Sequence, residues 1–192
     1  MNEVSCLKKE IFEWLIAIIV AVALYFVIHQ FLFLVYTING DSMHPTLKNG
    51  EKVIVNKIGY TIGEIHKGDV VVFHADKTDD YVKRVIGTGG DKVSYKDDEL
   101  YVNGKKVDEP YLDENKLSKT NVQLTENFSV KDITSPSVDT IPDGKLLVLG
   151  DNREVSKDSR YFGLIDEDQV VGEVALRFWP FNVFHYNFDP AQ

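Results

Sequence analysis

A long apolar run near the N-terminus is the strongest pattern along the chain. Residues 11–38 are almost wholly apolar and are interrupted only by Glu13 and by the pair His29 and Gln30. A helix of about 20 apolar residues is long enough to span the hydrocarbon core of a bilayer. The run therefore predicts a transmembrane anchor over residues 11–36, preceded by a short segment, residues 1–10.

A cleaved signal peptide is the alternative explanation for this run. Its apolar region would be about 7–15 residues long and would end at small residues, whereas this run is longer and ends in Phe31 to Tyr36. Lys8 and Lys9 precede the run and Asp41 follows it, so the positive-inside rule predicts a cytoplasmic N-terminus. We expect a single-pass protein of the cell membrane whose residues 37–192 lie on the extracytoplasmic face.

Beyond residue 47 the pattern changes to short β-branched and aromatic runs bounded by Gly, Asp and Asn. The pair Asn103-Gly104 is a strong hairpin signal between two of these runs. Without long helical patterns, the runs predict a mainly β fold, an all-β barrel-like or sandwich-like domain. The predicted strands are Lys52–Asn56, Asp69–Phe73, Tyr81–Thr88, Lys92–Tyr95, Glu99–Val102, Lys105–Val107, Lys145–Leu149 and Gln169–Trp179.

The density of apolar residues falls between residues 108 and 143. This composition indicates an inserted segment, a small subdomain with few short strands. An aromatic tail follows the last predicted strand, from Phe181 to Phe188. The tail either closes the barrel or lies along the membrane.

Composition and charge narrow the range of functions. With 192 residues, 44% of them hydrophobic, the chain can form one soluble core and one membrane span. A net charge of −9 without a block of Lys or Arg argues against nucleic-acid binding. Cys6 is the single cysteine, so no intramolecular disulfide is possible. The histidines are scattered and the acidic segments do not fit a calcium loop, so we expect neither a metal nor a cofactor.

Two residues carry candidate chemistry. Ser42 ends the sequence Asn39-Gly-Asp-Ser, which is ordinary turn chemistry, and an isolated serine is usually a turn residue. A serine nucleophile needs a neighbouring base, and none of the five histidines has the sequence context of a catalytic base. Lys83 lies within a predicted strand, where its side chain and that of Arg84 point to opposite faces. On its own, such a lysine is most often a surface residue.

Three segments together change this interpretation. They are Ser-Met-His-Pro-Thr-Leu at residues 42–47, Tyr-Val-Lys-Arg-Val-Ile at 81–86, and Gly-Asp-Asn-Arg-Glu-Val-Ser-Lys-Asp-Ser-Arg-Tyr-Phe-Gly at 150–163. In this order they resemble the motifs of type I signal peptidases, and the resemblance extends from the apolar run to about Gly172. It implies a membrane-bound serine endopeptidase that removes signal peptides from preproteins exported by the general secretory pathway.

The resemblance also implies roles for individual residues. Ser42 corresponds to the nucleophile and Lys83 to the general base of a Ser-Lys dyad. Ser156 corresponds to a hydroxyl that helps to hold the lysine amine, and Asp158 and Arg160 to a pair that supports the site. An inactive, membrane-tethered binding protein with a peptidase-like fold is the alternative, and it would be expected to lack Ser42 or Lys83.

The third motif also offers a second ion pair. Asp151 and Arg153 lie in one loop, and an arginine fork suits a carboxylate. A bridge between them would hold the loop together, and we assign Asp151, Arg153 and Arg160 structural roles.

Acting as a base requires that Lys83 be neutral part of the time, so its pKa must fall from about 10.4 to about 7–8. Burial against apolar walls supplies such a shift. The amide of Ser42 is the expected oxyanion donor, because Gly40 gives the turn conformational freedom. Some family members carry a serine at the position of Gly40 as a second oxyanion donor, so the sequence leaves open whether this protein has a second donor.

A preprotein bound as an extended chain presents alternate side chains to the enzyme. If apolar residues wall the sites for the first and third residues before the cut, alanine is the natural occupant of both, and an Ala-X-Ala cleavage site is expected. Membrane lipid is the second expected partner. The predicted wall residues are Tyr36, Ile38, Met43, Leu47, Tyr81 and Val82.

Overall fold

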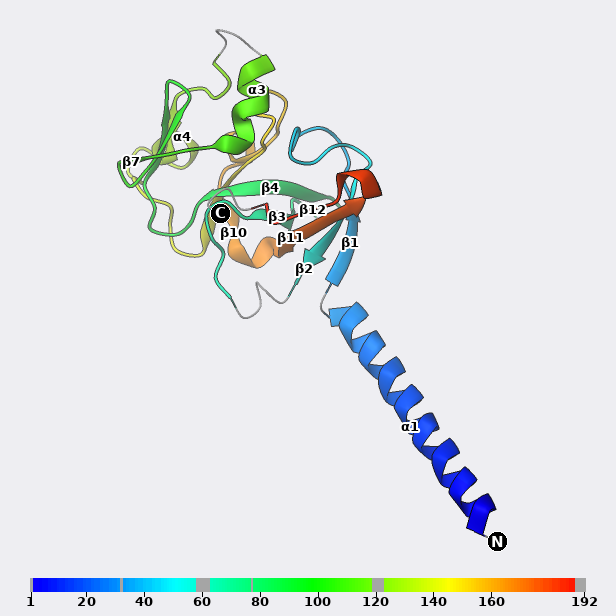
Figure 1. The fold of residues 1–192 in the computed structure, drawn as a ribbon. Helices are drawn as coiled ribbons and strands as arrows, with labels where there is room; N and C mark the ends of the chain where they lie inside the picture. The colour runs from blue at the N-terminus through cyan, green and yellow to red at the C-terminus, as the bar shows by residue number, and fades with distance from the viewer. Residues whose placement is uncertain (1, 32, 58–62, 77, 119–122, 189–192) are drawn as a thin grey trace.

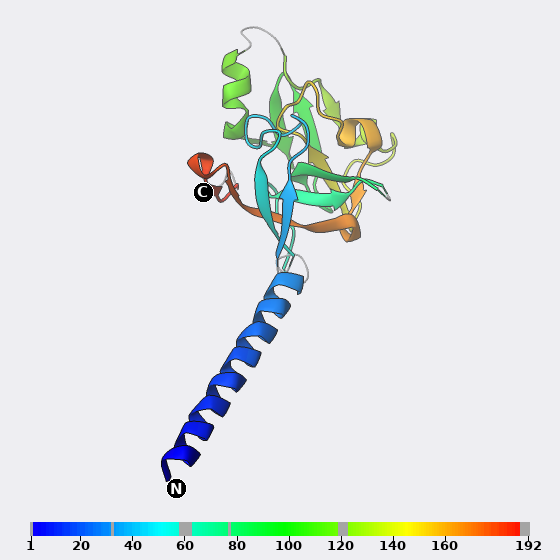
Figure 2. The ribbon, with the colours of Figure 1, turned by 90° about the vertical axis from the view of Figure 1, so that its right-hand side faces the viewer.

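The protein consists of one N-terminal helix and a β-rich body (Figures 1 and 2). The computed structural model describes residues 2–31, 33–57, 63–76, 78–118 and 123–188. Helix α1, Asn2–Phe31, projects away from the body in both views. The body contains two antiparallel sheets, so the predicted mainly β fold is confirmed.

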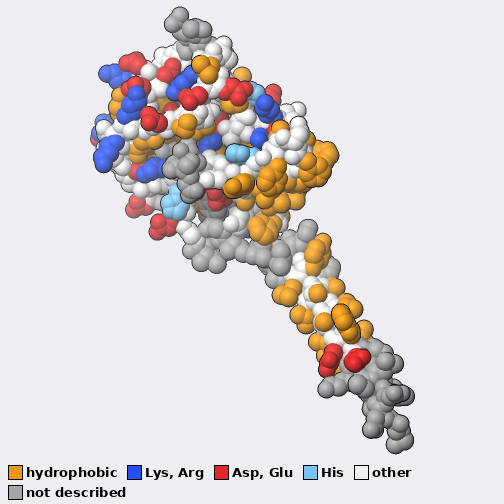
Figure 3. All heavy atoms as spheres, in the orientation of Figure 1, with side chains coloured by type: hydrophobic (Ala, Val, Ile, Leu, Met, Phe, Trp, Pro, Cys, Tyr) orange, Lys and Arg blue, Asp and Glu red, His pale blue; other side chains and the backbone are white. Residues whose placement is uncertain are grey.

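Large apolar side chains on α1 are exposed from Phe12 to Tyr25, and Figure 3 shows them along the helix. Among the helices in the described part of the chain, none combines the length and apolarity that a membrane crossing requires. The predicted anchor over 11–36 is also too long as a helix, because α1 ends at Phe31 and residues 33–36 belong to strand β1. The side chains of Lys8, Lys9, His29 and Gln30 lie outside the described residues.

The larger sheet is a curled, antiparallel half-barrel with the order β1-β2-β11-β3-β4-β9-β10, and β12 pairs with β11. Predicted and observed strands agree to within a residue or two at most ends, whereas β1 was predicted as part of the anchor. The strands are β1 Phe33–Thr37, β2 Lys52–Asn56, β3 Val70–His74, β4 Asp80–Gly87, β9 Lys145–Leu149, β10 Ile165–Asp166, β11 Val170–Trp179 and β12 His185–Tyr186.

The smaller sheet has the order β7-β6-β5-β8. Its strands are β5 Val93–Lys96, β6 Glu99–Val102, β7 Lys105–Val107 and β8 Phe128–Ser129. The predicted hairpin joins β6 to β7, and Asn103 and Gly104 both have positive φ, 53° and 77°. Two successive positive φ angles are the geometry for which an Asn-Gly pair is favoured.

Short helical turns complete the body. The inserted segment contains η1 Pro110–Leu112, α3 Asp113–Ser118 and α4 Val130–Ile133. Within its described residues, β8 is the one strand, so the segment is more helical than its composition indicated. Elsewhere, α5 Ser159–Phe162, η2 Glu167–Gln169 and η3 Phe181–Val183 connect the last strands.

The larger sheet is buried on both faces. Along β3, Val70 and Val72 pack into one apolar cluster, while Val71 and Phe73 pack into another. Because successive side chains alternate between faces, a strand that is buried on both faces has a continuous run of apolar residues in its sequence. The aromatic tail is divided between core and surface. Phe188 is buried in the first cluster, whereas the other aromatic side chains of the tail are exposed, namely Phe181, Phe184 and Tyr186.

A buried polar network joins the two sheets. Arg153, which follows β9, donates to Glu109 Oε1 (2.6 Å), to Tyr95 Oη (2.9 Å) and to Thr125 Oγ1 (3.0 Å). These partners come from the smaller sheet and the inserted segment. The predicted bridge between Asp151 and Arg153 is therefore wrong, because Arg153 pairs with a carboxylate that is distant in sequence.

The network predicts a large effect on stability. Glu109→Ala leaves the Arg153 guanidinium buried without its carboxylate, and removing one partner of a buried pair costs about 3–5 kcal/mol. Urea unfolding of the purified protein should show this as a lower midpoint. Glu114→Ala, which removes an exposed carboxylate from the same segment, is the matched control and should leave the midpoint almost unchanged. Equal midpoints for the two variants would contradict the assignment.

Candidate active site

Ser42 lies in the turn that follows β1. Two buried side chains in this turn, Met43 and Leu47, anchor it in the core, and Leu47 N donates to Met43 O (2.9 Å). Gly40 has φ +88°, a conformation that L side chains rarely adopt. The glycine therefore allows the turn to present Ser42 at the surface of the core.

Lys83 approaches Ser42 from strand β4. Its Nζ lies 2.7 Å from Ser42 Oγ, donates to Val82 O at 2.9 Å, and lies 5.4 Å from the centre of the Tyr81 ring. The residue is only 4% exposed. Burial lowers the pKa of Lys83 to about 8, although Asp158 and Asp151 oppose this shift. The contact joins two motifs that are 41 residues apart.

This arrangement can perform nucleophilic catalysis without histidine. When the Lys83 amine is neutral, it can accept the hydroxyl proton of Ser42 across the same short contact. An amine with a pKa near 8 is neutral for a substantial fraction of the time at neutral to mildly alkaline pH. The pair therefore has the geometry and the protonation behaviour that a Ser-Lys dyad needs.

The loop of the third motif holds the serine turn in place. Asn152 N donates to Ser42 O (3.0 Å), and Asn152 Nδ2 donates to Asp41 O (3.1 Å). No role for Asn152 was predicted from the sequence. Its two contacts reach across more than 100 residues of sequence, so a local pattern could not predict them. Its position inside the third motif was the signal that could have indicated a role in the site.

Arg84 occupies the opposite face of β4, as the alternation of a strand predicts. The side chain is fully buried and donates from Nε and Nη2 to both oxygens of Asp151 (3.0 and 2.8 Å). Its Nη1 donates to the carbonyls of Gly68 (2.7 Å) and Phe188 (2.6 Å). Asp151 thus links the third motif to Arg84 on β4 and does not pair with Arg153 of its own loop.

Asp158 and Arg160 form the expected supporting pair. Arg160 Nε and Nη2 each lie 2.8 Å from one oxygen of Asp158, and Arg160 Nη2 also donates to Arg153 O (2.7 Å). Asp158 Oδ2 accepts from Gly150 N (3.1 Å). The carboxylate therefore fixes both ends of the loop around the third motif.

Ser156 differs from expectation. Its hydroxyl is buried and has no hydrogen-bond partner within the described part of the chain, so the expected contact with the Lys83 amine is not formed. The Lys83 amine uses Val82 O and Ser42 Oγ instead. The hydroxyl does lie close to Gly150, where an added Cβ would come within 2.2 Å of Ser156 Oγ.

A cleft of about 570 Å³ opens at Ser42 and Lys83. It lies between β1 and the first half of β4. The prediction for Leu47 is wrong, because this side chain is fully buried in the core and lies outside the cleft. The other predicted wall residues do line it, namely Tyr36, Ile38, Met43, Tyr81 and Val82.

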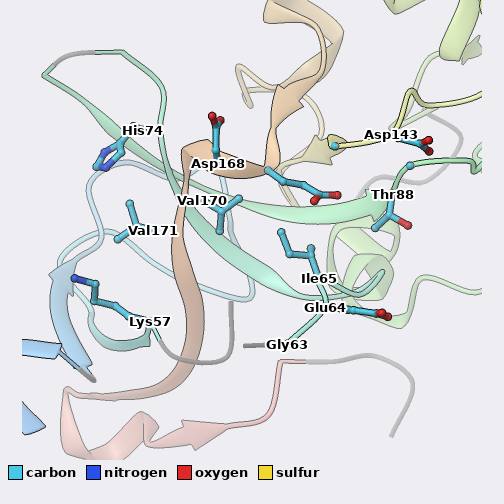
Figure 4. A pocket seen from close by; sticks show the side chains of 13 residues that line it. Lys57, Gly63, Glu64, Ile65, His74, Thr88, Asp143, Asp168, Val170 and Val171 are labelled. Carbon is cyan, nitrogen blue, oxygen red and sulfur yellow. The ribbon is translucent and has the colours of Figure 1, made fainter. Parts of the chain in front are cut away.

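A second cavity, of about 720 Å³, lies elsewhere on the body (Figure 4). Its four carboxylates come from three separate segments, namely Glu64, Asp143 and the neighbours Glu167 and Asp168. The described residues contain no group of His, Cys, Asp or Glu that could hold a metal ion. None of the described residues that line this cavity belongs to the three motifs, so the smaller cleft is the candidate active site.

Comparison with known proteins identifies the family. The model of a family described as signal peptidase, peptidase S26, matches residues 11–179. The chain belongs to the signal peptidase family. It is 61% identical over 186 residues to signal peptidase IB of Staphylococcus aureus (strain MRSA252), covering 96% of this chain and 97% of that protein. Signal peptidase I of Bacillus caldolyticus is 47% identical over 175 residues, covering 91% and 93% of the two chains.

A solved structure supports the same family. The crystal structure of a signal peptidase I from Enterococcus faecalis V583 matches with a TM-score of 0.55 and 36% identity, covering 59% of this chain and 98% of that one. The protein is a serine endopeptidase that cleaves signal peptides. The inactive alternative is not favoured, since Ser42 and Lys83 are both present and in contact.

Gly150 lies close to the turn that carries Ser42, so we predict that a larger residue at this position lowers activity. A Cβ at Gly150 would lie 2.4 Å from Ser42 O and 2.2 Å from Ser156 Oγ, so Gly150→Ala must displace the turn that carries Ser42. A misplacement of about 1 Å in an active site can cost about 100-fold in rate. We expect a loss of this order in kcat in a signal-peptide cleavage assay, with a circular dichroism spectrum that is unchanged. A fully active variant would show that the contact does not position Ser42.

Proposed function

We propose that Ser42 is the nucleophile and Lys83 the general base of this signal peptidase. The observation that carries the proposal is the 2.7 Å contact between Lys83 Nζ and Ser42 Oγ, made by a buried amine whose pKa is lowered to about 8. As Ser42 Oγ attacks the scissile carbonyl, the neutral amine accepts the hydroxyl proton. The resulting ammonium gives this proton to the nitrogen of the leaving peptide as the peptide bond breaks.

The second half of the reaction regenerates the serine. The signal peptide is now esterified to Ser42 Oγ, and Lys83, neutral again, accepts a proton from an attacking water. The new bond forms between the water oxygen and the acyl carbon, and Ser42 leaves with the proton held by Lys83. The amide of Ser42 is the proposed oxyanion donor, and the positive φ of Gly40 supports the turn that aims it.

Substrate recognition follows from the cleft. A strand-like substrate between β1 and β4 would direct alternate side chains to the wall. Ile38, Met43, Tyr81 and Val82 line the same cleft as Ser42 and give it an apolar wall. We infer that the first and third residues before the cut are small and that Ala-X-Ala sites are preferred.

The location of the enzyme is part of the proposal. We infer that the apolar run that begins at residue 11 anchors the protein in the cell membrane, with residues 1–10 in the cytoplasm and the catalytic body, residues 37–192, on the extracytoplasmic face. The apolar sequence of residues 11–31 and the exposed apolar side chains of α1 support this anchor. Its partners are then membrane lipid and preproteins of the general secretory pathway, whose apolar segments lie in the same bilayer.

The dyad is tested by two conservative variants. Ser42→Ala removes the nucleophile, and Lys83→Arg replaces the base with a group that stays protonated at any working pH. Each should abolish preprotein cleavage by the purified full-length protein. Ser137→Ala and Lys92→Arg make the same chemical changes at exposed positions and should keep normal activity. Appreciable activity in either dyad variant, measured beside these controls, would exclude the proposed mechanism.

The pKa of Lys83 predicts the pH dependence. Below about pH 8 the amine is protonated and cannot accept the serine proton, so kcat/KM should fall as the pH decreases through about 8 and rise along a single limb above it. The profile is measured between about pH 6 and pH 10 with one Ala-X-Ala substrate. A midpoint near 10.4, about the value of an unperturbed lysine, would place the base in a solvent-exposed site and contradict the structure.

A further inference from the structure

A hydrogen bond crosses the substrate cleft away from the dyad. Tyr36 Oη, on β1, donates to Asp80 Oδ2, at the start of β4, at 2.9 Å, and both residues line the cleft. In the sheet order, β2, β11 and β3 separate β1 from β4. The curl of the sheet therefore brings these two strands together, and the Tyr36–Asp80 contact spans the gap between them.

The Asp80 carboxylate is held from a second side. His74 is the register partner of Asp80 at the end of β3, and its Nδ1 lies 2.6 Å from Asp80 Oδ1. His74 also borders the second cavity, as Figure 4 shows. Burial raises the pKa of Tyr36 to about 12, so the phenol is protonated and donates to the carboxylate at neutral pH. Both oxygens of Asp80 are thus oriented, while its side chain stays 29% exposed.

The position of Asp80 in the cleft indicates which substrate residue would lie beside it. β1 directly follows the region of α1, so Tyr36 is on the side of the cleft nearer the helix. If the apolar segment of the substrate lies in the same bilayer as α1, the residues before the cut run from Asp80 towards Ser42. Asp80 precedes Lys83 by three residues, roughly 10 Å at about 3.3 Å per residue. The same length of extended substrate also contains about three residues.

We propose that Asp80 is a specificity-determining residue that selects against acidic side chains, and in favour of basic ones, at the fourth residue before the cut. The inference rests on the proposed function, since it assigns a further preference to the same cleft. The other charged residues that line the cleft are Asp41, Lys83 and Lys157. All three of Asp41, Asp80 and Lys157 are exposed, but side chains from β1 and β3 fix the Asp80 carboxylate at the edge of the cleft.

The test compares substrates that differ by one charge. Purified full-length enzyme is assayed at a fixed pH with preproteins that keep Ala at the first and third residues before the cut and carry Asn or Asp, and Gln or Lys, at the second or fourth residue. Two like charges about 5 Å apart in a largely aqueous site interact weakly. We therefore expect kcat/KM to be about fourfold lower for Asp than for Asn at the fourth position, and Lys to be favoured over Gln. In an extended chain the second position lies two residues, roughly 7 Å, farther from Asp80, so it should show a smaller preference.

Asp80→Asn should bring the Asn-to-Asp ratio of kcat/KM close to one. The ratio is taken within each enzyme, so a general change in activity does not affect it. Asp79→Asn removes the same charge from the neighbouring residue, which does not line the cleft, and should keep the wild-type ratio. In the wild type, raising the salt concentration from about 0.05 M to about 0.5 M should reduce the ratio, because salt screens exposed charges.

The outcomes separate this inference from the function on which it rests. If the wild type cleaves the neutral substrates but shows no preference at any position, or if Asp80→Asn keeps the wild-type ratio, the role of Asp80 is excluded. A wild-type ratio that is insensitive to salt would also exclude it, and this measurement needs no variant. If the wild type cleaves none of the Ala-X-Ala substrates, the proposed function fails and the inference falls with it.

Discussion

A lysine amine buried against a serine hydroxyl is the constraint on which this structure depends. Burial favours the neutral amine, but any free carboxylate nearby would favour the ammonium. Asp151 and Asp158 both raise the pKa of Lys83, and each of them is paired with an arginine, Arg84 or Arg160. The arginines therefore allow two carboxylates to organise the third motif without fully reversing the effect of burial on Lys83.

The sequence predicted those parts of the structure that depend on local pattern. The strands follow from short apolar runs, and the opposite orientations of Lys83 and Arg84 follow from the period of a strand. Partners that lie far apart in sequence were not predictable in this way. Arg153 was expected to pair with Asp151 in its own loop, but the two sheets bring Glu109 closer. Leu47 has the character of a wall residue, yet the turn directs it into the core.

The inserted segment acquires a structural role that its composition did not indicate. Glu109 and Thr125 hold Arg153, and Asn115 Nδ2, from α3, donates to the carbonyls of His44 (3.1 Å) and Asp151 (3.0 Å). These contacts reach the serine turn and the third motif together. A polar segment can do this because its side chains donate to backbone carbonyls, a role that apolar patterning does not reveal.

The bond from Arg84 to the carbonyl of Phe188 has a consequence for biosynthesis. Arg84 neighbours Lys83 on β4, and its guanidinium is satisfied in part by the far end of the chain. During translation, β4 emerges more than 100 residues before Phe188. The hydrogen bonds of Arg84 are completed only after Phe188 has left the ribosome, so the hydrolytic site reaches its final form late in synthesis, long after residues 2–31 have emerged.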